Sequence, residues 1–65
     1  MAVSRKIVSF SVERVSGDYD TNFTEAWDAA VTEASASDYS TVFVEKIGGS
    51  LKKDRYILWL EKVTV

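Results

Sequence analysis

The chain has 65 residues, with ten acidic and eight basic side chains, a net charge of −2, and neither histidine nor cysteine. This length allows one domain, over residues 1–65, and the near balance of charge argues against a nucleic-acid binder. The absence of cysteine and histidine excludes disulfides, thiolate or imidazole metal sites and the common nucleophile–base pairs of enzymes. We therefore expect a protein that is not an enzyme.

Such a short domain buries only about 60% of the surface that its unfolded chain exposes, so we expect oligomerisation to stabilise it. Ser4 and Ser9 interrupt the first apolar run, which is unlike a signal peptide. No stretch approaches the roughly 20 apolar residues that cross a bilayer. The sequence predicts a cytoplasmic protein that binds neither membranes nor nucleic acid.

The first predicted element is a strand within residues 3–16, where apolar and polar side chains alternate. Val8, Phe10 and Val12 share one face, and an alternation with period two is typical of a half-buried strand. Residues 17–21 are turn formers that lead into a helix.

Residues 22–35 form the only predicted helix. Its apolar residues recur at helical spacing, at Phe23, Ala26, Trp27, Ala30, Val31 and Ala34. Asn22 is a suitable N-cap, and Glu25 three residues later would complete a capping box. We expect the apolar stripe, Trp27 included, to cover one face of a sheet.

Asp18, Asp20 and Asn22 have the alternate spacing of the first ligands in an EF-hand calcium loop. Phe23 and Ala29 stand where that loop needs glycine and glutamate, so we expect a turn and no metal site.

Further along, basic residues gather at residues 52–55, where a solvated loop is favoured over a phosphate site.

Two further strands are predicted, at residues 41–47 and 55–65, joined by a hairpin loop over residues 48–54. The order β-α-β-β predicts an α+β fold, a three-stranded antiparallel sheet with one amphipathic helix on one face.

The last strand is apolar on both faces, and one helix can cover only one of them. The second face carries Ile57, Trp59, Val63 and Val65, an apolar patch that needs a partner or ligand. We expect self-association, with an interface formed by Ile47, Trp59, Val63 and Val65. An alternative is a small protein-interaction module, such as a viral or host-factor inhibitor, that uses this open sheet face or an edge strand.

Several spacings match a known family. Phe23 follows Gly17 by six residues, the helix then carries Glu25-Ala26, Ala30-Val31 and Ala34, and Tyr56 opens a last strand over residues 56–61. In length, element order and spacing, residues 7–65 resemble the dodecins. The resemblance implies a non-catalytic binding or storage protein that forms a hollow homododecamer, with its helices outside and its sheets inside.

Many dodecins bind flavin against a tryptophan of the second strand, with a glutamine of the third strand at the ring edge. The resemblance places Phe43 and Ile57 at these positions, and Trp59 offers a further stacking surface. Phenylalanine can stack on a flavin, whereas isoleucine cannot form the hydrogen bonds. The resemblance implies a small-aromatic-ligand site at Phe43, Ile57 and Trp59, with flavin binding weak or absent.

Overall fold

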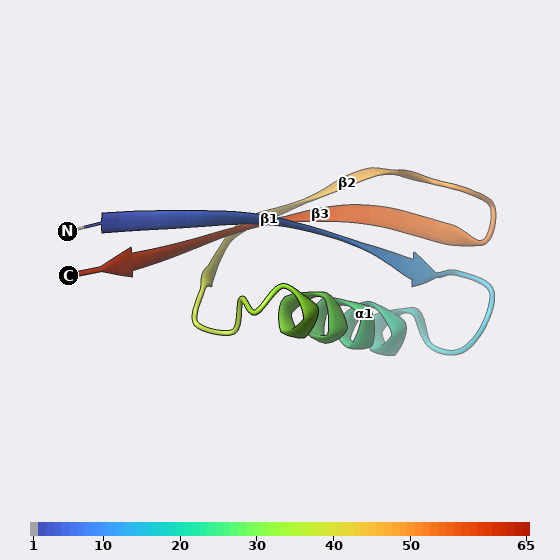
Figure 1. Ribbon diagram of the computed structural model, residues 1–65. Helices are drawn as coiled ribbons and strands as arrows, with labels where there is room; N and C mark the ends of the chain where they lie inside the picture. Colours follow the sequence, from blue (N-terminus) through green and yellow to red (C-terminus); the bar gives the residue numbers. More distant parts are fainter. Residues whose placement is uncertain (1) are drawn as a thin grey trace.

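A computed structural model describes residues 2–65 and has the predicted α+β architecture (Figure 1). Strand β1 (Ala2–Glu13), helix α1 (Tyr19–Glu33), strand β2 (Ser40–Gly49) and strand β3 (Lys53–Thr64) follow one another along the chain. The strands form one antiparallel sheet in the order β1-β3-β2, and α1 packs on one face, mainly against β1. The predicted fold class is confirmed. Within residues 2–65, no helix is long and apolar enough to span a membrane.

The hydrophobic core lies between α1 and the sheet. Its buried apolar residues are Val8, Phe10, Val12, Ala36, Leu58 and Leu60. The strand members share one sheet face because Val8 pairs with Leu58 and Phe10 with Tyr56. The predicted helical stripe packs against this cluster, although Trp27 is only half-buried. The alternation in the first strand and the helical spacing in the helix therefore identified the core faces correctly.

Phe10 is the centre of the aromatic part of the core. Its ring meets Phe23 edge-to-face at a centroid distance of 5.4 Å and stacks on Tyr56 at 5.6 Å. The Trp27 ring lies 6.1 Å away. Aromatic pairs at such distances stabilise by about 0.5–1.5 kcal/mol each beyond the area they bury. Phe10 therefore joins β1, β3 and two turns of α1.

The start of the helix differs from the prediction. The helix begins at Tyr19, and its N-cap is Asp18, whose carboxylate accepts a hydrogen bond from the Thr21 backbone N–H at 3.2 Å. Asn22 lies inside the helix, and its amide donates to the backbone carbonyls of Glu13 and Ser16 at 3.3 and 2.6 Å. Both residue types are good caps. Asp18 is the cap because the Asn22 side chain is instead bonded to the backbone at and after the end of β1.

The helix ends in a Schellman motif in which Ser35, with φ of 55°, takes the position that usually holds glycine. The Ala36 N–H donates to the Val31 carbonyl at 2.9 Å, and the Ser35 N–H donates to Thr32 at 3.1 Å. The Lys6 ammonium also donates to the Ala34 carbonyl. This end was uncertain in the sequence because no glycine marks it.

The hairpin loop is shorter than predicted, spanning residues 50–52 between β2 and β3. Gly48 and Gly49 belong to β2, and Gly49 pairs with Asp54. Gly49 has φ of 148°, and a Cβ there would collide with the Lys53 carbonyl oxygen. The glycine pair that predicted a turn is therefore part of an irregular strand end. Glycine is needed there because only glycine fits so close to the opposite backbone.

The sheet is longer than the helix that covers it (Figure 1). Residues 2–4 of β1 pair with residues 62–64 of β3 and form a two-stranded arm beyond the end of α1, because β2 begins at Ser40 opposite Glu61. The molecule measures 44 × 18 × 16 Å, with a radius of gyration of 13.0 Å. A compact domain of this length has a radius of gyration of roughly 11 Å. The single chain is therefore elongated.

We predict that Phe10→Ala lowers the free energy of unfolding by about 3–5 kcal/mol, because it removes a large buried ring and leaves a cavity. Urea unfolding followed by far-ultraviolet circular dichroism measures the change. Val15→Ala is the control, since Val15 is 65% exposed. Equal midpoints for the two variants would contradict the central role of Phe10.

Candidate interface and aromatic site on the open sheet face

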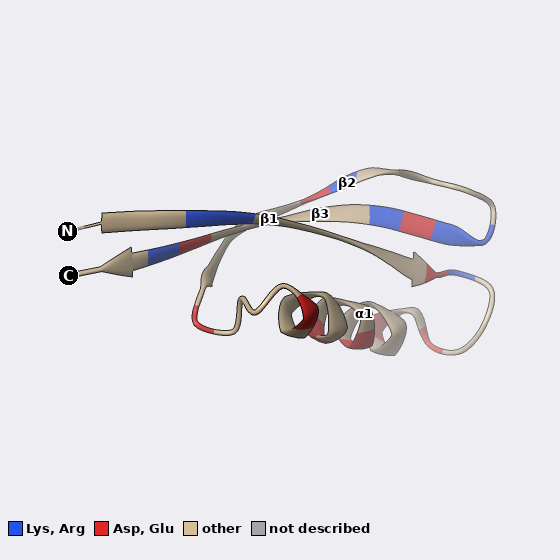
Figure 2. Cartoon of the chain, viewed as in Figure 1, with Lys and Arg blue, Asp and Glu red and all other residues tan. Residues whose placement is uncertain are grey.

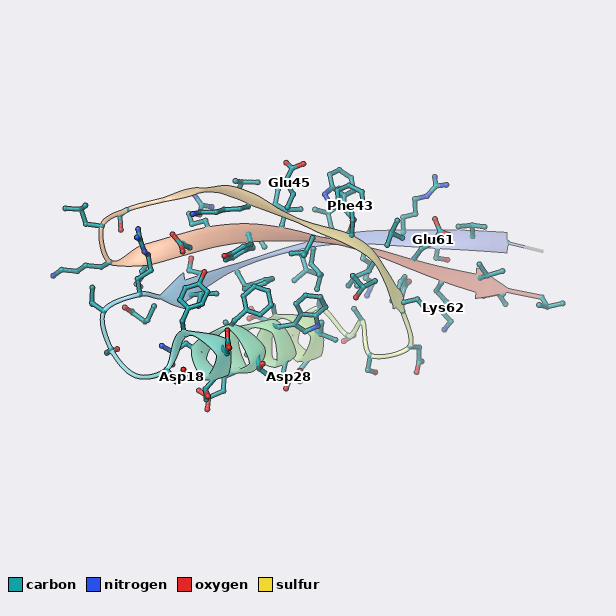
Figure 3. All side chains as sticks on the ribbon, turned by 180° about the vertical axis from the view of Figure 1, so that it is seen from behind. Asp18, Asp28, Phe43, Glu45, Glu61 and Lys62 are labelled. Carbon is teal, nitrogen blue, oxygen red and sulfur yellow. The ribbon has the colours of Figure 1, made fainter. Side chains whose placement is uncertain are left out.

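The sheet face opposite α1 is uncovered, and we call it the open face. Figure 3 shows Phe43 and Glu45 projecting from this side, away from α1. Its apolar side chains form a strip along β1, β2 and β3, consisting of Val3, Ile7, Phe43, Ile57, Trp59 and Val63. Four members of this open-face strip are 46–59% exposed, whereas Ile57 and Trp59 are half-buried. The open face is therefore the exposed apolar surface that we expected from a last strand with apolar residues on both faces.

Phe43 and Trp59 form the aromatic site. They are cross-strand neighbours whose rings stack with centroids 5.2 Å apart and planes at 20°. A register shift between Thr41 and Phe43 places Val42 beside them. The resulting pocket of about 270 Å³ is lined by the apolar residues Ile7, Val42, Phe43 and Trp59, and also by Arg5, Lys6, Leu60 and Glu61. Because the two rings already stack on each other, a ligand would contact an outer ring face.

Polar groups at the pocket are few. Arg5 pairs with Glu61 across the strands, with Nε and Oε2 3.3 Å apart. The indole N–H of Trp59 is buried and has no hydrogen-bond partner among residues 2–65. Leaving such a donor unpaired costs about 1–3 kcal/mol. The pocket therefore offers a ligand a large apolar surface and one exposed ion pair, because the Trp59 N–H is buried.

The structure brings only some of the predicted site residues together. Ile57 shares the open face with Trp59 and pairs with Ser9 on one side and Glu45 on the other. Val63 lies on the arm opposite Val3, and Val65 follows the end of β3.

Ile47 lies further along β2, at a second register shift between Lys46 and Gly48. The predicted ligand residues therefore share one face, whereas the predicted interface residues are spread over most of the sheet's length.

A second polar cluster, absent from the sequence prediction, anchors the start of α1 to β3. The Tyr19 hydroxyl donates to Asp54 Oδ2 at 2.9 Å and shares a short hydrogen bond with the Tyr56 hydroxyl. Arg14 and Lys46 lie 3.7 and 3.5 Å from the other oxygen of the same carboxylate. Asp54 is buried. The sequence indicates the burial of Asp54 by its spacing, because it lies an even number of residues before the buried Leu58 and Leu60 of β3.

The cluster controls the ionisation of its own members. Burial alone would raise the pKa of the Asp54 carboxyl, but the Tyr19 hydrogen bond and the Lys46 and Arg14 charges hold that pKa below its ordinary value. The hydrogen bond to Tyr56, then burial, then Asp54 raise the pKa of the Tyr19 hydroxyl well above its ordinary value. Neither group is tuned toward neutral pH, so we interpret the cluster as structural rather than catalytic. Within residues 2–65, no group of three potential metal ligands is present.

We predict that Asp54 makes the stability of the fold depend on pH in the acid range. The pKa of Asp54 is lower in the folded chain than in the unfolded chain, where it is near 3.8. The ionised carboxylate therefore stabilises the fold above pH 3.8, and this stabilisation is lost as the pH falls through the folded pKa. Asp54→Asn should be less stable than wild type at neutral pH, and the difference should shrink toward about pH 2. Thermal unfolding across this range measures the difference, with the exposed Asp20→Asn as control. A constant difference would contradict the assignment.

Comparison with known proteins identifies no relative. No protein-family model, no curated protein and no solved structure matches the chain. The resemblance to the dodecins therefore stays a prediction that rests on residue spacing and element order.

Proposed function

We propose that the chain is a non-catalytic, dodecin-like binding or storage protein that self-associates by covering the open-face strip. The single observation that carries this proposal is the strip itself, in which Phe43 and Trp59 stack on a sheet face that α1 does not cover. A surface of this kind is typical of interfaces, where aromatic residues are enriched.

The size and shape of the single chain support association. Its accessible surface is 4634 Å², whereas a folded monomer of its mass has roughly 4,200 Å². An isolated two-stranded ribbon is at best marginally stable in water. The arm is such a ribbon, with Val3 and Val63 exposed on it. A second copy that covers the arm and the strip would bury this apolar surface.

The charges on the open face favour another copy as the partner. Arg5 and Glu61 lie on the open face beside the strip residues and carry charges of opposite sign. In a two-fold contact the same patch faces itself, so Arg5 of one copy can approach Glu61 of another. A patch that carries both signs is therefore self-complementary, whereas a patch of one sign would repel its own copy.

A small aromatic ligand would bind at the Phe43–Trp59 site by stacking on an outer ring face, since the Trp59 N–H is buried and out of its reach. Flavin fits poorly, because Ile57 offers its ring edge no hydrogen bond.

The second candidate function is a protein-interaction module, favoured by β2, a fully exposed edge strand to which another strand could add. The cytoplasmic location stays a prediction.

We predict that Trp59→Asp dissociates the oligomer, because it places an unpaired charge in the interface at a cost of several kcal/mol per copy. Light scattering coupled to size exclusion measures the mass, and circular dichroism verifies the fold. The matched control is Val15→Asp in an exposed loop, which should keep the wild-type mass. A Trp59→Asp variant with the wild-type mass would exclude the open face as the interface. A monomeric wild-type protein would favour the interaction-module function.

We also predict weak or absent riboflavin binding by the wild-type protein. Two unpaired polar groups at the ring edge would cost about 1–3 kcal/mol each, or roughly a hundredfold in affinity. Ile57→Gln restores an amide at this position and should bind more tightly. Quenching of riboflavin fluorescence measures both affinities. Stoichiometric quenching by the wild type at sub-micromolar concentration would contradict the prediction.

A further inference from the structure

The two signs of charge lie on different elements. Between Arg14 and Lys46 the chain has seven acidic residues and no lysine or arginine. Figure 2 shows the acidic residues along α1 and basic residues where β2 turns into β3. The basic group consists of Lys46, Lys52, Lys53 and Arg55. A molecule charged in this way has an acidic surface and a basic surface that can attract each other between copies.

A groove lies on the acidic side, between α1 and β1, and we call it the β1–α1 groove. It has a volume of about 580 Å³ and is lined by apolar β1 residues, by Ser9 and Ser11, by Glu33 and by small helical residues, Ala26, Ala29, Ala30 and Ala34. Alanine side chains allow another chain to approach the helix closely. β1 is also an edge strand of the sheet. The groove can therefore accept an apolar side chain from another molecule.

The electrostatics of the groove favour a cation beside that side chain. Glu33 lines the groove in the last turn of α1, which has no basic residue. The Glu33 carboxylate forms no ion pair within residues 2–65. Lys6 contacts the carbonyls of Ala34 and Ser35 rather than the Glu33 side chain.

The β2–β3 hairpin tip has the complementary features. Leu51 at the tip is 91% exposed. Lys52 follows it and forms no ion pair with any residue in the described chain, whereas Lys53 pairs with Glu13 at 3.6 Å. The Ser50 N–H donates to the Lys53 carbonyl at 2.7 Å and closes the turn. The tip therefore presents an apolar side chain beside a free cation on an ordered turn.

We infer that the hairpin tip of one copy docks in the β1–α1 groove of another, with Leu51 against the alanines and Lys52 near Glu33. The same chain does not fill its own groove, because β2 and β1 lie on opposite sides of β3. Two grooves facing each other would bring the acidic helices together, which disfavours a symmetric groove-to-groove contact. The partner is therefore a second copy in a head-to-tail contact.

This contact rests on the proposed self-association but uses a different surface, which shares only Ile7 with the open-face strip. Head-to-tail contacts close into rings when the rotation between copies permits. A copy that uses both surfaces therefore contacts more than one neighbour. The groove contact depends mainly on charge, so it weakens with rising salt concentration more than the mainly apolar contact of the strip does.

A charge exchange tests the inference, with masses measured by light scattering at low ionic strength. Glu33→Lys and Lys52→Glu should each weaken association about tenfold or more, because each places like charges together. The double variant reverses both signs and should restore association, as should a mixture of the two single variants. Asp20→Lys, at the other end of α1 and outside the groove, is the control. Circular dichroism verifies each fold.

The outcomes separate this contact from the open-face contact. If Glu33→Lys and Lys52→Glu keep the wild-type mass while Trp59→Asp dissociates, the groove contact is wrong and the open-face contact stands. If the reverse holds, the open-face contact is wrong. Loss of association in both single variants without restoration in the double variant would overturn the direct pairing of Glu33 with Lys52. A monomeric wild type would overturn both contacts.

Discussion

The dimensions of the single helix constrain the rest of the structure. Helix α1 has 15 residues, whereas β1 and β3 have 12 each. At about 1.5 Å per helical residue and about 3.3 Å per strand residue, the helix is roughly 22 Å long and the strands roughly 40 Å. The helix therefore covers one face of the sheet over about half its length. The arm follows from this mismatch in length. The open-face strip is uncovered because the single helix lies on the other face, and β2 is exposed because α1 packs mainly against β1.

Both ends of the helix are held to the sheet by polar contacts. At the start, Tyr19 binds Asp54 and Tyr56 of β3. At the end, the Lys6 ammonium of β1 binds the Ala34 carbonyl and lies 5.2 Å from the centre of the Tyr39 ring. These contacts fix the helix over the Phe10 cluster. Because the covered half is fixed in this way, the uncovered half of the sheet remains available to other molecules.

The two proposed contacts depend on different physical forces and serve different needs. The open-face strip is apolar and self-complementary, which suits a two-fold contact. The β1–α1 groove and the hairpin tip are separate surfaces of opposite charge, which suits a head-to-tail contact. A chain with both kinds of contact can form a closed assembly larger than a dimer. Such an assembly would supply the buried surface that six buried apolar residues provide only in part.

The sequence by itself determined the fold class, the core faces and the existence of an open apolar face, because these follow from periods of 2 and 3.6 residues. It also put Phe43 and Trp59 in one predicted ligand site, and in the structure their rings stack on each other. Only the tertiary structure decided the N-cap, since Asp18 and Asn22 are equally suitable and the bonds from Asn22 to Glu13 and Ser16 chose between them. The alternation in β3 indicated that Asp54 faces the core, but its partners Tyr19, Arg14 and Lys46 come from distant parts of the chain. These contacts, and the separation of the groove from the hairpin, were decided by the tertiary structure, because local pattern does not say which distant residues meet.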